Sequence, residues 1–209
     1  MRKLIVGMTA AVAALTLAGS AAAQETGTPV FKSPYRTYTS SEVGATLSDP
    51  GGAGWGLEGF YGYGHDRWDI GLRGGFVDQP DGGNTRVLAG VSARTRVLQS
   101  SESFPLDGAL TLGAGLNFND GTYAFIPIGI SLGRRVLLEN SDVTFVPYVH
   151  PVMIPAFGNN IGGDSDSDIF FALGLGVDIK FTNSIDVRVA GALGDSPWDG
   201  VSVGLAFIH

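Results

Sequence analysis

The sequence predicts an all-β chain in which eight to ten antiparallel strands close into an up-and-down barrel. Period-two alternation of apolar residues recurs from residue 35 to the C-terminus, and no stretch there shows sustained helical periodicity. The 209 residues include 32 glycines, and only 16% are charged, whereas typical soluble domains carry about 25%. Cysteine is absent, which excludes disulfides, thiolate metal sites and a cysteine nucleophile.

The N-terminus has the features of a secretory signal. Arg2 and Lys3 precede an apolar run over 4–17, and small residues follow up to Ala23. The run is shorter than the roughly 20 residues that a membrane-spanning helix needs. We therefore expect a cleaved signal over 1–23, a flexible leader over 24–34 and a barrel over 35–209.

Taken in order, the strands differ in the clarity of their pattern. The segment 35–47 is mostly polar, and we predict it as a first strand that makes the number even and returns both termini to the periplasm. The segment 142–154 is apolar on both faces, and it contains Pro147 and Pro151, so we expect a bulge or an irregular stretch there and at Pro127. Eight strands alternate cleanly, namely 55–63, 68–76, 87–93, 110–118, 126–132, 169–181, 185–189 and 201–207.

The two faces of these eight strands differ in charge and in size. The apolar rows hold no charged residue, and most glycines lie on the opposite rows. Glycine adds no packing on a solvated face, whereas small residues beside paired charges suit a narrow barrel interior. The large apolar rows then face outward toward a bilayer, which defines a transmembrane barrel. The opposite rows carry the predicted lumen charges: Glu58, Arg67, Asp69, Arg73, Arg86, Arg94, Arg96, Asp178, Lys180, Asp186 and Arg188.

Strand length and aromatic placement agree with a bilayer. About 13 residues at a tilt of about 45° rise roughly 28 Å, close to the apolar band of about 25 Å of outer-membrane barrels. Aromatic residues collect near strand ends, where we expect interfacial girdles. They are Trp55, Tyr61, Tyr63, Trp68, Phe118, Tyr123, Phe181, Trp198 and Phe207.

Over 35–209 this pattern resembles the small outer-membrane β-barrels of Gram-negative bacteria, such as the OmpA-, OmpX- and OmpW-like barrels. The resemblance implies an outer-membrane location, contact with lipid and lipopolysaccharide, and insertion by the barrel-assembly machinery. Such barrels usually end in a strand that finishes with Phe, whereas here Phe207 is followed by Ile208 and His209. We expect a monomer without a cofactor, and the formal net charge of −7 disfavours nucleic-acid binding.

Few residues favour catalysis or metal binding. Ser131 lies in a GxSxG pattern, but it is mid-strand and lacks the strand-to-helix turn of a hydrolase elbow. The histidines at 65, 150 and 209 lack suitable neighbours, so we expect no enzyme activity. Asp164, Asp166 and Asp168 form a weak calcium candidate that lacks the loop glycine and the bidentate Glu, so we expect a solvated loop and no metal site.

The role of the lumen stays open at this point. Seven of the eleven predicted lumen charges are basic, which fits either a packed plug or a narrow anion-preferring passage for small solutes. The barrel would then have a structural or surface role, or act as a passive pore. The alternatives are a soluble periplasmic lipid-binding β-barrel, with apolar rows around a ligand cavity, and an outer-membrane hydrolase.

Overall fold

The computed structural model describes residues 26–34, 40–51, 54–79, 84–118, 121–138, 141–158, 166–194 and 199–209. Regular structure in these residues is β-strand throughout, and they contain no helix long and apolar enough to cross a membrane. The signal predicted over 1–23 lies outside the described residues. The strands are β1 (Glu42–Asp49), β2 (Trp55–His65), β3 (Trp68–Asp78), β4 (Arg86–Leu98), β5 (Asp107–Phe118), β6 (Thr122–Phe125), β7 (Ile128–Gly133), β8 (Val136–Leu137), β9 (Thr144–Phe157), β10 (Ser167–Lys180), β11 (Ile185–Gly194) and β12 (Gly200–Ile208).

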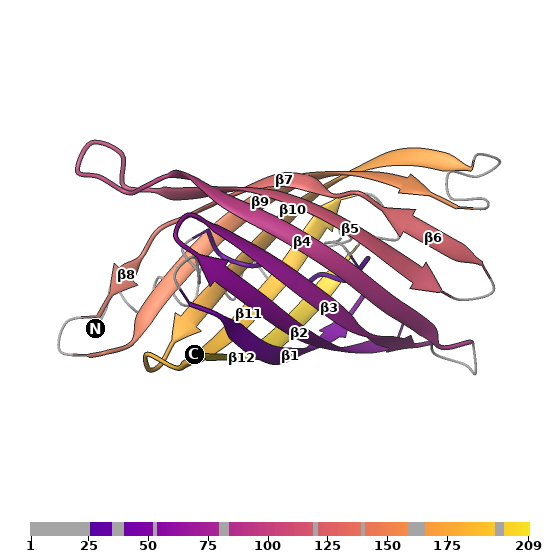
Figure 1. The fold of residues 1–209 in the computed structure, drawn as a ribbon, viewed down its shortest axis with the longest axis horizontal. Helices are drawn as coiled ribbons and strands as arrows, with labels where there is room; N and C mark the ends of the chain where they lie inside the picture. The colour runs from indigo at the N-terminus through magenta and orange to yellow at the C-terminus, as the bar shows by residue number, and fades with distance from the viewer. Residues whose placement is uncertain are drawn as a thin grey trace.

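The strands form one antiparallel sheet that closes on itself (Figure 1). Closure occurs where β1 pairs with β12, with Glu42 opposite Ile208 and Asp49 opposite Val201. The predicted all-β, closed antiparallel barrel is confirmed, with ten strand positions around it. The predicted strand 35–47 corresponds to β1, which begins at Glu42, and residues 35–39 lie outside the described residues.

One of the ten positions is filled by β6, β7 and β8 in series. All three pair with β9 in one unshifted register, in which Ala124 faces Phe157 and Val136 faces Phe145. On the other side, β5 pairs with both β6 and β7, again without a shift. The gap between β6 and β7 contains Pro127, whose carbonyl still accepts the amide of Gly113 from β5.

Three prolines at every fourth residue of β9 explain the interruptions. The carbonyls of Pro155 and Pro147 accept hydrogen bonds from the amides of Ile126 and Arg134, which lie in the two gaps between β6, β7 and β8. The register places Pro151 between these two prolines. An antiparallel residue directs its N–H and C=O to the same neighbour, so the three missing donors all face β6–β8. Pairing of β9 with β10 is therefore continuous. The predicted irregularity is confirmed, as an interrupted ladder without a bulge.

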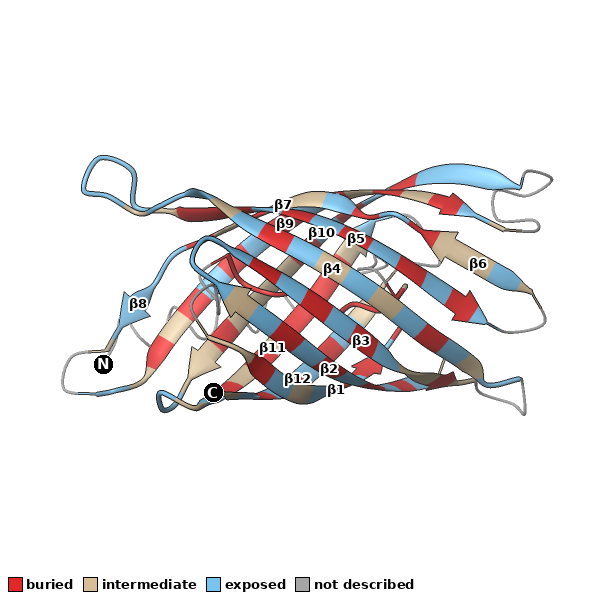
Figure 2. Cartoon of the chain, in the orientation of Figure 1, coloured by how far each residue is buried: buried red, intermediate tan, exposed pale blue. Residues whose placement is uncertain are grey.

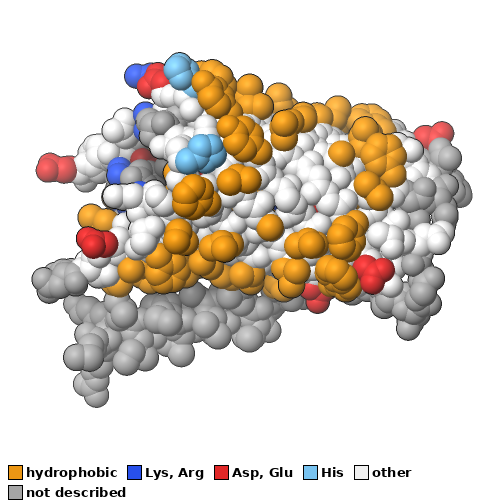
Figure 3. Space-filling model, turned by 60° about the horizontal axis from the view of Figure 1, so that its bottom comes forward, with side chains coloured by type: hydrophobic (Ala, Val, Ile, Leu, Met, Phe, Trp, Pro, Cys, Tyr) orange, Lys and Arg blue, Asp and Glu red, His pale blue; other side chains and the backbone are white. Residues whose placement is uncertain are grey.

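Side chains alternate between the outside and the inside of the barrel wall (Figure 2). The outward rows are large and apolar, and Leu72, Phe171 and Leu205 keep 56%, 60% and 57% of their surface exposed. Figure 3 shows apolar side chains over the wall, with charged side chains mainly toward its ends. A lipid-binding carrier would enclose these rows around a cavity, so the soluble-barrel alternative is wrong.

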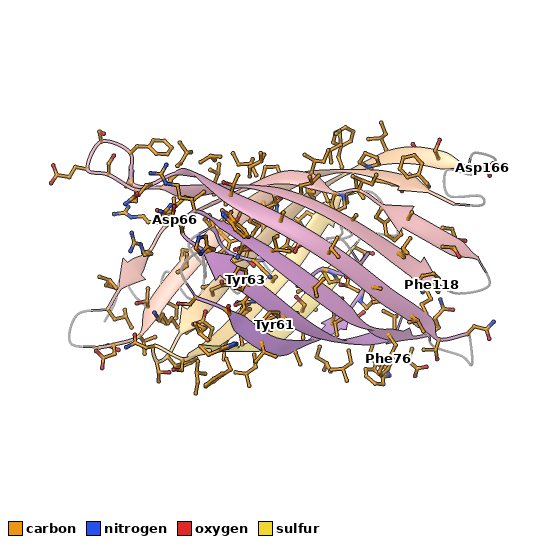
Figure 4. The ribbon with its side chains drawn as sticks, in the orientation of Figure 1. Tyr61, Tyr63, Asp66, Phe76, Phe118 and Asp166 are labelled. Carbon is orange, nitrogen blue, oxygen red and sulfur yellow. The ribbon has the colours of Figure 1, made fainter. Side chains whose placement is uncertain are left out.

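The two ends of the barrel differ. The end that holds the Asp66 turn and the pairing of Ser41 with His209 is called the turn end, and the opposite end, with the β9–β10 connection, is called the loop end. Figure 4 places Tyr63 toward the turn end, and Phe76 and Phe118 toward the loop end. Aromatic side chains thus lie near both ends of the wall, as the predicted girdles require.

Candidate functional site

The first described residues, 26–34, lie inside the barrel (Figure 1, indigo). Thr26, Phe31 and Ser33 have no exposed surface, and Lys32 keeps only 4% of its own. This placement corrects the expectation of a flexible leader over 24–34, because the described part of that leader is packed in the lumen. Burial of Phe31 and pairing of the polar groups offset the entropy lost when such a segment is ordered.

Residues 26–34 form the lumen segment, which runs from the loop end toward the turn end. The carbonyl of Pro29 accepts a hydrogen bond from Ser202 Oγ at 2.7 Å, near the loop end of β12. Ser33 Oγ donates to Asp178 Oδ2 at 2.8 Å, near the turn end of β10. The first described residue, Thr26, therefore lies toward the end opposite the C-terminus, unlike the expected placement of both termini at one end.

Lys32 belongs to a cluster of charges around one aromatic ring. Its Nζ lies 3.3 Å from Glu42 Oε1, and Arg188 forms an ion pair with the other oxygen of the same carboxylate. The Lys32 ammonium and the Arg188 guanidinium also lie 5.7 Å and 5.1 Å from the centroid of the Phe60 ring. One carboxylate and one aromatic ring thus stabilise two buried cations.

Arg94 connects the lumen segment to the wall. Its guanidinium holds Asp69 through two nitrogens, with Nε 3.1 Å from Oδ1 and Nη2 2.6 Å from Oδ2. The remaining nitrogen, Nη1, donates to the carbonyl of Ser33 at 2.8 Å. A bidentate pair with a third bond gives each of the three guanidinium nitrogens a hydrogen bond in a buried position.

A second carboxylate, Glu58, meets the loop-end half of the lumen segment. The Thr28 hydroxyl donates to Glu58 Oε1, and Thr26 Oγ1 lies 3.0 Å from Thr28 Oγ1. Arg73 Nε lies 3.9 Å from the other oxygen of Glu58. This carboxylate therefore meets a wall cation on one side and a hydroxyl of the segment on the other.

The structure brings most, but not all, of the predicted lumen charges together. Arg86, Arg96 and Lys180 are only partly buried, near strand ends. Arg67 is exposed in the tight turn between β2 and β3, so its assignment to the lumen was wrong. The turn, in which Asp66 has a φ of 53°, removes Arg67 from the alternation. The remaining seven are buried: Glu58, Asp69, Arg73, Arg94, Asp178, Asp186 and Arg188.

Two members of the charge network were not predicted from the sequence. Lys32 lies in the presumed leader, and Glu42 lies in the weakly patterned first strand, although its position in the alternation would have placed it inside. Including both leaves the balance of charge unchanged, because one is a cation and the other a carboxylate; the predicted excess of basic groups disappears because Arg67, Arg86, Arg96 and Lys180 are not buried. The buried charges along the lumen are four cations (Lys32, Arg73, Arg94 and Arg188) and five carboxylates (Glu42, Glu58, Asp69, Asp178 and Asp186). Asp107, also buried, lies at the turn end and pairs with Arg135 at 3.5 Å.

An apolar cluster fills the other side of the lumen around Phe31. The inward face of β9 contributes to it, which explains why this strand is apolar on both faces. The ring of Phe31 also meets His150 edge-on, with centroids 5.3 Å apart. Its buried members are Phe31, Phe125, Tyr148, Val152, Ile154, Ala156, Phe170, Ala172, Ala190 and Ala192.

The residues weighed for catalysis occupy structural positions. Ser131 Oγ donates to the carbonyl of Lys32 at 3.1 Å. His150 Nε2 lies 2.9 Å from Thr111 Oγ1, deep in the lumen. His65 is exposed at the turn end, where its ring stacks with that of Tyr63 at 6.5 Å.

The metal candidate is described only in part. Asp164 lies outside the described residues, Asp166 is exposed, and Asp168 accepts the amide of Ile169 at 2.7 Å. Across the part of the chain that the structure describes, no three His, Cys, Asp or Glu side chains are grouped so as to hold a metal ion.

A small cavity lies beside the lumen segment. A cavity of about 20 Å³ lies between Lys32, Arg94, Thr111 and His150. Since a water molecule needs roughly 10–15 Å³ in this measure, the cavity has room for about one water molecule. The arrangement holds a peptide segment and paired charges, with space for a solvent molecule.

Comparison with known proteins points to one family. The family model described as the outer membrane protein beta-barrel domain matches residues 9–193. Among solved structures, the β domain of the Bordetella autotransporter BrkA is 14% identical, with 81% of this chain and 99% of that chain covered and a TM-score of 0.54. The N-terminal barrel of Pseudomonas aeruginosa OprF is 12% identical, with 83% and 100% covered and a TM-score of 0.39. A search of curated proteins finds no match.

Proposed function

The chain belongs to the outer membrane protein β-barrel domain family, and we propose that it is a closed, non-catalytic barrel of the Gram-negative outer membrane. In this proposal the barrel has a structural or surface role, and its own N-terminal segment shuts the lumen. The observation that carries the proposal is the burial of residues 26–34 between wall side chains, with a neighbouring cavity of about 20 Å³. A lumen that is occupied by its own segment, with room for about one water molecule in the cavity beside Lys32, supports a barrel closed to solutes.

The proposal includes a route to the membrane and a set of contacts there. The precursor is exported, loses residues 1–23 and is inserted as a monomer by the barrel-assembly machinery. Its outward apolar rows contact lipid and lipopolysaccharide, and its loop end faces the outside of the cell. The structural positions of Ser131 and His150 support the absence of catalysis.

Planar-bilayer conductance of the refolded mature chain tests the closed state. We expect a silent bilayer, with an open porin inserted under the same conditions as the positive control. Heat-modifiable gel migration of the same sample establishes that the barrel is folded. Regular current steps from the folded chain would overturn the closed-barrel function.

A narrow passive pore is the outcome that such steps would support. In that case, neutralising Arg86, Arg94 and Arg96 distinguishes conduction through an anion-preferring lumen from leakage around the protein. Only conduction through the lumen would lose its anion preference.

A further inference from the structure

We propose that the lumen is a recognition site for an extended peptide, which residues 26–34 fill in the intact chain. The site would bind this peptide non-covalently and exchange it for a free peptide of the same sequence once the connection to β1 is cut. The inference rests on the closed-barrel function, since the same segment closes the lumen. Its ligand class is an extended peptide with an aromatic residue followed by a cation.

Recognition begins with the peptide backbone. Side chains from three strands donate to carbonyls of the segment: Ser202 to Pro29 at 2.7 Å, Ser131 to Lys32 at 3.1 Å and Arg94 to Ser33 at 2.8 Å. Such bonds read an extended chain whatever its side chains, as strand-addition sites do. Proline at positions 29 and 34 also removes two amides that would need acceptors inside the barrel.

The aromatic pocket recognises Phe31. A Cβ at Gly174 would lie 2.6 Å from Phe31 Cδ1, so this glycine provides the space that the ring occupies. His150 meets the ring at an interplanar angle of 67°, and the apolar cluster surrounds it. The pocket therefore requires a large apolar side chain on the bound peptide and no side chain at position 174 of the wall.

The next residue is recognised by charge. Lys32 Nζ lies 3.3 Å from Glu42 and 5.7 Å from the Phe60 ring centroid, and both groups belong to wall strands. A neutral residue at this position would leave the carboxylate with less positive charge around it in a buried place. Aromatic and cationic subsites side by side thus define a Phe-Lys signature.

The hydroxyl groups at the two halves of the segment set its direction. Thr28 donates to Glu58 in the loop-end half, and Ser33 donates to Asp178 in the turn-end half at 2.8 Å. A peptide bound in the reverse direction would exchange these partners and move Phe31 away from Gly174. The site is therefore specific for sequence and for direction.

The test uses the full mature chain with a protease recognition sequence inserted between Thr39 and Ser40. The protein is folded in detergent micelles, nicked, and mixed with an excess of a fluorescent peptide of residues 24–34. Incorporation is measured as fluorescence that co-elutes with the barrel. We expect the wild-type peptide to be incorporated, a Phe31→Ala peptide to bind about 100-fold more weakly, and a Lys32→Ala peptide about 10-fold more weakly.

Matched controls address specificity. A scrambled peptide of equal composition is expected not to be incorporated. A barrel carrying Gly174→Ala is expected to lose affinity for the wild-type peptide and to lose less for the Phe31→Ala peptide, because the smaller side chain tolerates the added methyl group. Equal incorporation of all peptides, or none of the wild-type peptide, would overturn the proposal.

Should the inserted sequence resist the protease, the pieces 24–39 and 40–209 are refolded together. Folding of the barrel that depends on the wild-type peptide, and not on the scrambled one, supports recognition, and indifference to both peptides contradicts it. Conductance of the uncut chain tests closure separately. A chain that is silent when uncut, and that takes up no wild-type peptide when nicked, therefore refutes recognition and leaves the closed-barrel function standing.

Discussion

At the scale of single residues, the lumen is stabilised by side chains that each contact the lumen segment and the wall together. Phe31 fills the space left by Gly174, and Arg94 holds both Asp69 and the Ser33 carbonyl. Such residues have no solvent to replace a lost partner, so their substitution costs more than that of an exposed residue. Stability measurements on the intact chain can therefore detect the packing of the lumen segment.

Replacing Phe31 by Ala is expected to destabilise the intact barrel by about 3–5 kcal/mol, the usual cost of removing a buried phenylalanine ring. The measurement is the urea midpoint of unfolding in detergent, followed by heat-modifiable migration. Phe104→Ala is the matched control, because this ring is 45% exposed in the β4–β5 connection. Equal effects at both positions would mean that the lumen segment contributes no packing.

Replacing Arg94 by Met is expected to cost about 3–5 kcal/mol, because it leaves the Asp69 carboxylate buried without its bidentate partner. Adding Asp69→Leu to the same chain is expected to recover part of the loss. The double-mutant cycle on unfolding free energies measures this coupling. Additive losses would show that the ion pair is not the source of the effect.

At the scale of elements, the weakest part of the wall is the pairing between β9 and the position filled by β6, β7 and β8. The prolines of β9 remove donors on this side alone, and β7 has four partner pairs with β9, whereas β10 pairs with β9 along its whole length. A missing ladder bond is costly at the depth of a bilayer, since lipid cannot replace it. This seam is therefore where the wall should open first.

Hydrogen exchange tests this order of stability. We expect the amides of β7 to exchange faster than those of β10, and Pro151→Val to slow exchange around Ile130 by restoring a donor on the facing residue. The added bond is worth about 0.5–1.5 kcal/mol, partly offset by the greater freedom of the unfolded chain. Pro105→Val, in the exposed β4–β5 connection, supplies the control and should give no protection. Slower exchange in β7 than in β10 of the unmodified chain would contradict the prediction.

At the scale of the whole molecule, the lumen segment determines the charge of the interior as well as its space. Without Lys32, the buried lumen charges of the wall are three arginines and five carboxylates. The wall alone is therefore acidic, and the segment contributes a cation to it. This is the opposite of the anion preference that the arginines of the sequence indicate.

We accordingly expect a nicked barrel, washed free of residues 24–39 under mild denaturant, to conduct with a preference for cations. Reversal potentials in a salt gradient measure the preference, and the uncut chain, which should be silent, is the control. Glu42→Gln should weaken the cation preference, because it removes one negative charge from the lumen. Anion preference in the washed barrel would refute this account of the lumen charge.

The amino-acid sequence predicted most of the strands, their outward and inward faces, and the seven buried charges of the clean strands, although the strand expected over 126–132 begins only at Ile128 and four other charges are not buried. It could do so because the period-two alternation is local: each residue's face follows from its neighbours in the chain. Even the interrupted wall could be expected, because proline lacks a donor wherever it occurs.

The occupant of the lumen, in contrast, becomes evident only in the folded barrel. Residues 26–34 have no periodicity, and their partners lie on strands distant in the sequence, such as Asp178 and Ser202. The contacts that hold Phe31 and Lys32 exist only after the barrel closes, so no local pattern encodes them. The same closure brings Glu42 beside Arg188. The buried interior has no excess of basic groups, because four of the predicted basic residues are exposed or only partly buried near strand ends.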